Sequence, residues 1–239
     1  AGARQREDRR HFLLDTEQPI GQRVFVESFA EGNRVTLTRD AMRALRPTRK
    51  AGLRPEYEHV LVRRDGHLLE VTINRPDARN PLGEEGDGDL FAEAAARIKA
   101  DREVRCVILT GAGKAFSAGG NLKSMRERSG SFSGVGVHLR ERYRSGIHRM
   151  VRALWTLEVP MIAAVNGPAI GLGNDVACLA DMRIAADKAI FGATFLKIGL
   201  VPGDGGAWIL PRTIGHARAA ELFFTGDTID AQTALAWGL

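Results

Sequence analysis

The sequence predicts a layered α/β fold, because short apolar runs alternate with helical patterns along most of its 239 residues. Residues 104–110 and 161–165 are apolar runs of strand length, and each leads into a glycine-rich turn and then a helical pattern. Residues 59–63 and 67–73 alternate in polarity on either side of an Asp-Gly turn, which predicts a β-hairpin. A chain of this length can bury a substantial core.

Helices are expected where apolar residues recur at intervals of three and four. Five segments have this pattern: 90–100, 138–157, 207–214, 216–225 and 230–237. Residues 81–89 are rich in glycine and acidic residues, and residues 126–137 are rich in glycine and serine, so both are predicted to be loops.

Charge divides the chain into two predicted parts, an N-terminal extension (1–55) and a domain (56–239). The extension holds 12 Lys/Arg and 7 Asp/Glu, which leaves 22 of the 34 Lys/Arg and 22 of the 29 Asp/Glu for the domain. The extension has only weak strand patterns at 23–29 and 34–38, and residues 46–52 are typical of a linker. Because acidic residues interrupt its basic ones, neither nucleic acid nor membrane is an expected partner.

Several functional classes lack their sequence signatures. No apolar run is long enough for a membrane span or a signal peptide, so a cytoplasmic protein is expected. Cys106 and Cys178 lie in apolar patterns and are expected to be reduced. There is no P-loop, no Gly-x-Ser-x-Gly elbow and no metal-ligand spacing, so we expect neither a metal nor nucleotide chemistry.

Two glycine-rich turns are the candidate functional elements. One follows the strand at 104–110 and spans 111–123; the other follows the strand at 161–165 and spans 166–175. The first N–H groups of a helix lack internal partners, and glycine lets a ligand approach the backbone closely. Two such turns can direct two N–H groups at one developing oxyanion.

The order and spacing of four motifs resemble the crotonase (enoyl-CoA hydratase/isomerase) family. The motifs are Asn-Arg-Pro-Asp-Ala-Arg-Asn (74–80), Ala-Phe-Ser-Ala-Gly-Gly-Asn-Leu-Lys (115–123), Ile-Ala-Ala-Val-Asn-Gly-Pro-Ala (162–169) and Gly-Leu-Val-Pro-Gly-Asp-Gly-Gly (199–206). The resemblance runs from about residue 57 to residue 239. It implies a spiral of ββα units that assembles as a homotrimer or a dimer of trimers. Family members continue into further C-terminal helices, so the chain is expected to be truncated at Leu239.

The resemblance also implies an acyl-CoA thioester as the substrate. Coenzyme A is then part of the substrate, and no separate cofactor is expected. The thioester oxygen would accept hydrogen bonds from the N–H groups of Gly120 and Leu172. The other residues implied in substrate binding are Ala78, Arg79, Asn80, Ala118, Asn121, Leu122, Lys123 and Gly171.

The acid–base groups depart from the two glutamates usual in the family's hydratases. The first of these positions falls on Asp175 and the second on Phe195, which cannot transfer a proton. Asp204 is a further carboxylate, and an aspartate in the same Pro-Gly-Asp-Gly turn is catalytic in some relatives. Simpler roles remain open, because Asp175 could complement a helix dipole and Asp204 could be a helix N-cap. We expect Asp175 and Asp204 to act together.

Four functions remain open. The chain could be an enoyl-CoA hydratase, which the family resemblance favours. It could instead be an enoyl-CoA isomerase, or a hydrolase of a C–C bond or thioester. A fourth alternative is a weakly catalytic protein that binds acyl-CoA or RNA.

Overall fold

The computed structural model describes residues 59–239 and two short antiparallel strands nearer the N-terminus, β1 (Glu27–Ser28) and β2 (Val35–Thr36). Contacts divide the chain into two units, Ala1–Lys50 and Ala51–Leu239. The two strands fall within the weak strand patterns of the extension. The rest of the extension, including the predicted linker, lies outside the described residues.

A five-stranded sheet organises the second unit. Its strands lie in the order β3 (Val60–Asp65), β4 (Leu68–Ile73), β5 (Cys106–Gly111), β6 (Met161–Val165) and β8 (Met182–Ala185). The first two strands are antiparallel, which confirms the predicted hairpin, and the other neighbours are parallel. The carboxyl ends of β5 and β6 therefore meet at one edge of the sheet, and the two glycine-rich turns begin there.

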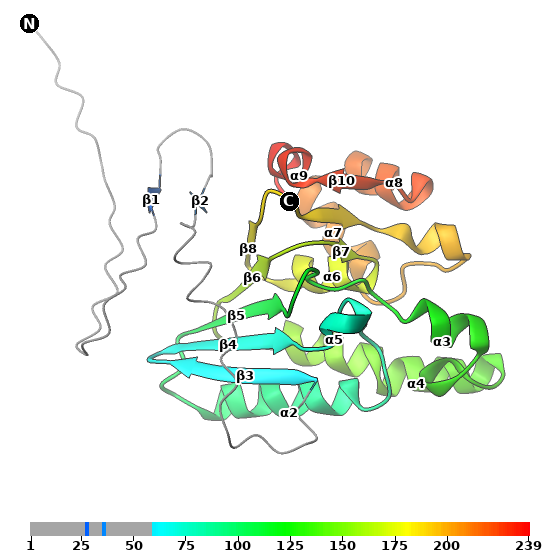
Figure 1. Ribbon diagram of the computed structural model, residues 1–239, viewed down its shortest axis with the longest axis horizontal. Coiled ribbons are helices and arrows are strands. Elements are labelled where there is room, and N and C mark those ends of the chain that lie inside the picture. The colour runs from blue at the N-terminus through cyan, green and yellow to red at the C-terminus, as the bar shows by residue number, and fades with distance from the viewer. Residues whose placement is uncertain (1–26, 29–34, 37–58) are drawn as a thin grey trace, which may run out of the picture. The chain divides into compact units, whose positions relative to one another are not determined.

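One face of this sheet forms the core with two helices, α2 (Asp87–Ala100) and α5 (Ile147–Trp155). Ile73 of β4 and Leu109 of β5 are fully buried in this core, together with Phe91 of α2 and Met150 of α5. Figure 1 shows α2 running alongside the strands. The alternation of buried residues along β5 is the period-2 pattern of a strand.

Two predictions about helices are wrong in detail. The segment 81–89 is not wholly a loop, because α2 begins at Asp87, whose carboxylate accepts hydrogen bonds from Arg75 and from the Glu84 N–H. The predicted helix at 138–157 is two helices, α4 (Gly136–Ser145) and α5, which meet at Gly146. Gly146 adopts φ −98° and ψ −88°, outside the helical region, so the helical hydrogen bonding is interrupted there.

The segment predicted as a loop at 126–137 also contains short helices. It includes the end of α3 (Leu122–Glu127), the 3₁₀ turn η3 (Gly130–Phe132) and the start of α4. The side chain of Asn121 accepts hydrogen bonds from the N–H groups of Lys123 and Ser124, which caps α3.

The C-terminal half adds a second sheet and four helices (Figure 1). Its strands lie in the order β10 (Thr228–Asp230), β9 (Ile190–Gly192) and β7 (Ala169–Ile170). The helical elements are α6 (Leu172–Leu179), η4 (Thr194–Ile198), α7 (Gly206–Ile214), α8 (His216–Thr225) and α9 (Ala231–Trp237). The predicted helix limits at 216–225 are confirmed, and those at 207–214 differ by one residue.

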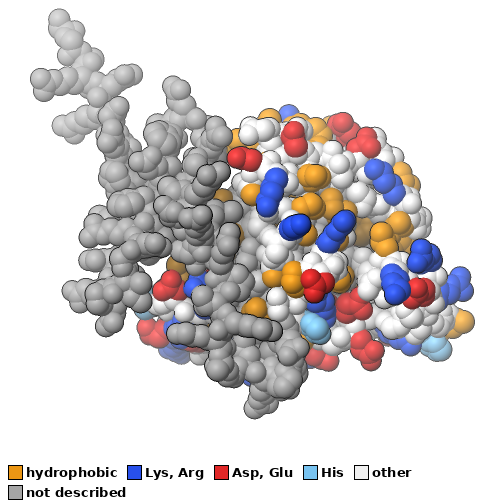
Figure 2. Space-filling view, in the orientation of Figure 1, with side chains coloured by type: hydrophobic (Ala, Val, Ile, Leu, Met, Phe, Trp, Pro, Cys, Tyr) orange, Lys and Arg blue, Asp and Glu red, His pale blue; other side chains and the backbone are white. Residues whose placement is uncertain are grey.

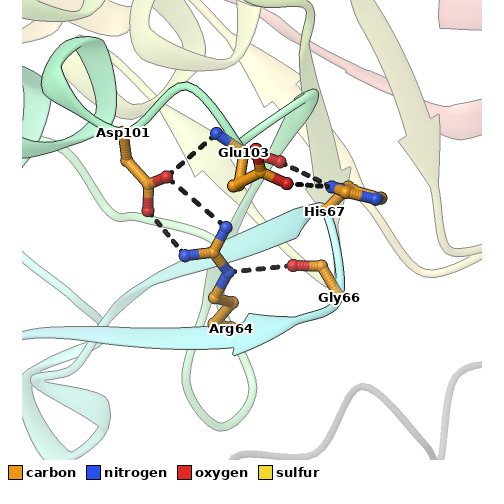
Figure 3. Close-up of polar contacts among 5 residues, drawn as sticks. All are labelled: Arg64, Gly66, His67, Asp101 and Glu103. Carbon is orange, nitrogen blue, oxygen red and sulfur yellow. Dashed lines mark hydrogen bonds and ion pairs between the residues drawn. The ribbon is translucent and has the colours of Figure 1, made fainter.

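A cluster of polar contacts ties the tip of the β3–β4 hairpin to the connection between α2 and β5 (Figure 3). The Arg64 guanidinium donates to Asp101 Oδ2 at 2.6 Å and to the Gly66 carbonyl at 2.9 Å. The Asp101 carboxylate accepts from the Glu103 N–H, and this bond lowers the pKa of Asp101, as does the neighbouring Arg64. His67 Nδ1 lies 2.7 Å from the Glu103 carbonyl oxygen. Because these groups are exposed, the cluster orients the hairpin more than it stabilises the domain.

The surface of the second unit carries both signs of charge, which agrees with the equal numbers of Lys/Arg and Asp/Glu in residues 56–239. On the face in Figure 2, basic, acidic and hydrophobic side chains are interspersed. Exposed large hydrophobic side chains occur at many places on this unit, and four of them, Leu196, Ile198, Leu200 and Val201, lie close together in the sequence. The described part of the chain contains no helix with the length and apolar character of a membrane span.

Candidate active site

The two glycine-rich turns lie directly against each other. The Ile170 N–H donates to the Ser117 carbonyl at 2.9 Å, and a parallel β-bridge joins Ser117 to Ala169. A β-carbon added to Gly119 would lie 3.3 Å from the Leu172 nitrogen, and one added to Gly173 would overlap Ser117. The close approach of the turns therefore requires glycine at these positions.

Each turn has N–H groups without a partner among the described residues, and those of Gly120 and Leu172 are among them. The Gly119 N–H donates to Ser117 Oγ, and the Gly171 N–H donates to the Gly192 carbonyl. The next N–H groups, those of Gly120 and Leu172, have no acceptor among the described residues. Leu172 is the first residue of α6, so its N–H also has no partner within the helix.

A third loop, at the end of β4, is held against the first turn. The Ala118 N–H donates to the Arg79 carbonyl at 2.9 Å. The Asn80 side chain is fully buried; it donates to the Ala112 and Ala115 carbonyls at 2.8 Å and accepts from the Arg75 N–H. The side chain of Asn80 is thus fully used in fixing this loop.

The Arg75–Asp87 ion pair supports the same loop from the opposite side. Arg75 donates two hydrogen bonds to the Asp87 carboxylate, at 2.7 and 3.0 Å, and a third to the Pro81 carbonyl at 3.1 Å. The Asp87 side chain is buried, and only 14% of the Arg75 side chain is exposed. Bidentate pairing of this kind fixes both position and orientation.

Asp175 and Asp204 are buried together although 29 positions separate them. Asp175 lies in the first turn of α6, and Asp204 lies in the turn before α7; each is 1% exposed. A β-carbon added to Gly206, the first residue of α7, would lie 1.9 Å from Asp175 Oδ2. The start of α7 is therefore packed directly onto the Asp175 carboxyl group.

The Asp204 side chain makes no capping hydrogen bond to α7. The N-cap position is occupied by Gly205, and no side chain there accepts a hydrogen bond. Both carboxyl oxygens of Asp204 and Oδ2 of Asp175 are buried without a partner among the described residues, while Asp175 Oδ1 accepts from Asn174 at 3.1 Å. The hydrogen bonds of the described residues therefore include no side-chain cap from Asp204 to α7, although the Gly206 N–H at the start of α7 acts to lower the pKa of Asp204 against the larger effect of burial.

The buried pair can hold one proton more readily than two negative charges. Burial, followed by the neighbouring Asp204, raises the pKa of Asp175 well above its usual range, and burial also raises the pKa of Asp204. Two ionised carboxylates are acceptors only, whereas a protonated Asp175 can donate to Asp204. The pair then titrates as a unit, with an acid and a base side by side.

Two further side chains lie at this site, and no sequence pattern indicates a role for them beyond helix packing. Tyr143 of α4 has its pKa raised by burial, and further by Asp204 and Asp175. His148 of α5 lies with Nε2 2.7 Å from the Gly203 carbonyl oxygen, and its ring meets that of Tyr143 edge-on. Both rings therefore contact the turn that carries Asp204.

Phe195 forms an apolar part of the site. It is 7% exposed, and its ring lies 3.8 Å from the position that a β-carbon on Gly171 would occupy.

Cys178 is buried, Cys106 is half-buried, and both are free thiols. In the part of the chain that the structure describes, no group of three or more His, Cys, Asp or Glu could hold a metal ion.

The α/β layers and the paired glycine-rich turns define a crotonase-like protein. The family model described as enoyl-CoA hydratase/isomerase matches residues 63–239, so the chain belongs to that family. This finding confirms the family resemblance of the four motifs.

Relatives in the family differ in their named activities. "Probable enoyl-CoA hydratase echA14" of Mycobacterium tuberculosis is 41% identical over 186 residues, which cover 77% of this chain and 69% of the relative. The 1,2-epoxyphenylacetyl-CoA isomerase of Escherichia coli is 37% identical over 183 residues, covering 76% and 68%. The short-chain-enoyl-CoA hydratase of Clostridium acetobutylicum is 39% identical over 190 residues, covering 77% and 68%.

A solved structure supports the fold. The crystal structure of an enoyl-CoA hydratase from Bacillus anthracis superposes with a TM-score of 0.69 at 34% identity, covering 75% of this chain and 67% of that one. The predicted crotonase-like α/β fold is confirmed by this match.

Proposed function

We propose that this protein is an enoyl-CoA hydratase, which adds water across the double bond of a 2-enoyl-CoA thioester. The observation that carries the proposal is the buried Asp175–Asp204 pair. Asp175 lies in the first turn of α6, which begins at Leu172 with its unpaired N–H. The family membership and the relatives named enoyl-CoA hydratase support the substrate class.

The unpaired N–H groups of Gly120 and Leu172 are proposed to bind the thioester oxygen. When water adds to Cβ, the electrons of the double bond move toward this oxygen and an enolate forms. Donors fixed by the backbone at Gly120 and Leu172 stabilise that charge without rearranging. Coenzyme A would lie along the residues that the family resemblance implies, namely Ala78, Arg79, Asn80, Ala118, Asn121, Leu122, Lys123 and Gly171. No separate cofactor takes part.

The carboxyl pair is proposed to move both protons. Ionised Asp204 takes a proton from water as the water oxygen bonds to Cβ. Neutral Asp175 gives its proton to Cα, which restores the thioester carbonyl. The pair begins and ends with one proton, so only water and the enoyl group are consumed. Phe195 keeps this part of the pocket apolar, which favours the one-proton state.

The test replaces each carboxyl group by its amide. Asp175→Asn and Asp204→Asn should each lower kcat by about 10²–10⁴-fold, because the amide keeps the shape but cannot transfer the proton. The double variant should lose much less than the product of the two losses, because the groups act as a unit. Mass spectrometry of products from a panel of enoyl-CoAs, in ordinary and heavy water, identifies the reaction. If Asp204→Asn keeps wild-type turnover, the paired mechanism is wrong.

An enoyl-CoA isomerase is the second candidate. Phe195 stands where the second glutamate of the family's hydratases falls, and isomerisation needs only one base. One relative, from Escherichia coli, is named 1,2-epoxyphenylacetyl-CoA isomerase, so an isomerase occurs among the named relatives. Isomerisation leaves the substrate mass unchanged, whereas hydration adds the mass of one water. Release of free coenzyme A or of a carboxylic acid would instead indicate a hydrolase.

We also propose a homotrimer or a dimer of trimers. The exposed hydrophobic stretch that contains Leu196, Ile198, Leu200 and Val201 supports this assembly, because contiguous apolar surface commonly marks an interface. Light scattering coupled to size-exclusion chromatography measures the mass directly, and a monomer at micromolar concentration would contradict the proposal.

A further inference from the structure

The position of Asp204 depends on the backbone turn that carries it. Its two carboxyl oxygens have no hydrogen-bond partner among the described residues unless Asp175 is protonated, although the side chain is 1% exposed. The turn has the sequence Gly203-Asp204-Gly205-Gly206, in which glycine permits many backbone conformations, and Gly205 adopts φ +108°. A contact that holds this backbone therefore helps to place Asp204 beside Asp175.

The imidazole of His148 contacts the backbone of this turn. Its Nε2 lies 2.7 Å from the carbonyl oxygen of Gly203. A carbonyl oxygen only accepts hydrogen bonds, so Nε2 must carry the proton and donate it. Because the peptide unit is planar, a fixed Gly203 carbonyl also fixes the direction in which the chain enters Asp204.

Tyr143 holds the imidazole in this orientation. The two ring centroids are 5.1 Å apart and the rings are nearly perpendicular, at 89°. This edge-on arrangement is favourable for aromatic rings. The Tyr143 ring also lies 3.8 Å from the position of a β-carbon on Gly203, so it packs against the turn itself.

We propose that His148 is a positioning residue, which places the Asp204 carboxylate for proton transfer by holding the Gly203 carbonyl. The inference rests on the proposed function, since it assigns His148 to the same carboxyl pair. Burial is the largest influence on the pKa of Asp204 and raises it, and the electrostatic interaction with His148 acts in the opposite direction.

A matched pair of variants tests the hydrogen bond. Glutamine and methionine have similar lengths, but only glutamine can donate to the Gly203 carbonyl. His148→Met should lower kcat about 10–100-fold with KM within about threefold, since a displacement of about 1 Å can cost about 10²-fold. His148→Gln should stay within about fivefold of wild type. His216→Ala removes an exposed histidine at the start of α8 and should leave both constants unchanged.

A second measurement is independent of turnover. Amide hydrogen exchange of the turn at 203–206 should become faster in His148→Met than in the wild type and in His148→Gln. If the wild type does not hydrate any enoyl-CoA, the proposed function fails, while this exchange still tests the positioning. Unchanged exchange in His148→Met, or an equal loss of kcat in the Gln and Met variants, would overturn the proposal.

Discussion

Gly206→Ala gives a direct test of how the Asp175 carboxyl group is held. Gly206 is the first residue of α7, and an alanine β-carbon there would lie 1.9 Å from Asp175 Oδ2 and 2.2 Å from its Cγ. Since atoms not bonded to each other normally stay about 3.4 Å apart, the carboxyl group must retreat by about 1.5 Å. A misplacement of about 1 Å can cost about 10²-fold in rate, so kcat should fall at least about 10²-fold.

The backbone of Gly206 is compatible with alanine, because Gly206 is not in the left-handed region and alanine is favoured over glycine in helices by about 1 kcal/mol. Overpacking at the buried Asp175 carboxyl group typically costs about 1–3 kcal/mol, so the fold of the variant is checked separately. Gly136→Ala is the matched control, because Gly136 is likewise the first residue of a helix but has no heavy atom within 4 Å of the added carbon. Its kcat should equal that of the wild type.

The assay follows loss of the conjugated enoyl thioester absorbance, and circular dichroism checks the fold of each variant. A folded Gly206→Ala variant with wild-type kcat would refute the placement of Asp175 in the reaction. An equal loss of kcat in Gly136→Ala would show that the assay reports a general effect of alanine at helix starts.

Three other perturbations have defined outcomes. In the folded chain Asp175 keeps its proton at pH values where the unfolded chain has lost it, so the unfolding free energy should fall as pH rises from about 4 toward the raised folded pKa. For one proton, the slope of this fall is at most about 1.4 kcal/mol per pH unit, and Asp175→Asn should remove much of it. Urea unfolding at several pH values measures the unfolding free energy of both proteins. If the wild type and Asp175→Asn show the same dependence of unfolding free energy on pH, the prediction is wrong. Gly120→Pro removes one proposed oxyanion donor and should lower kcat about 10²–10³-fold. Circular dichroism checks that the variant is folded. Full activity in a folded variant would exclude the Gly120 N–H as an oxyanion donor. Arg75→Lys keeps the charge but loses the bidentate contact with Asp87, so the unfolding free energy should fall by about 1–3 kcal/mol. KM for acyl-CoA should rise by a larger factor than kcat falls. An unchanged unfolding free energy would show that the Arg75–Asp87 pair contributes little to stability.

Local patterns in the sequence determined much of the secondary structure. The hairpin around the Asp-Gly turn, the strand at 161–165 and the helix at 216–225 follow from alternation, apolar runs and helical spacing, and all three are confirmed. The start of α2 was missed because the Asp87 side chain is stabilised by Arg75, 12 positions away. The interruption at Gly146 was missed because the helical periodicity of the apolar residues runs across it.

The sequence identified the two glycine-rich turns and the carboxylates, and the family resemblance led to the expectation that Asp175 and Asp204 act together. Each turn carries its own local signature, namely a strand followed by glycines and a helical pattern. Whether Asp175 and Asp204 meet depends on how α6 packs on α7, and no local pattern encodes that contact. The same holds for His148 and Tyr143, which the sequence presents only as members of a helical stretch.

The sequence therefore determined the family, the α/β class and the residues able to do acid–base chemistry, because these depend on residue type and on spacing along the chain. Only the tertiary structure decided which of those residues share one buried space. It shows that Asp204 makes no capping hydrogen bond to α7, that its carboxyl oxygens are buried beside Asp175, and that His148 contacts the preceding carbonyl. Burial and proximity set the protonation of a carboxyl pair, and both arise only when segments distant in sequence pack together.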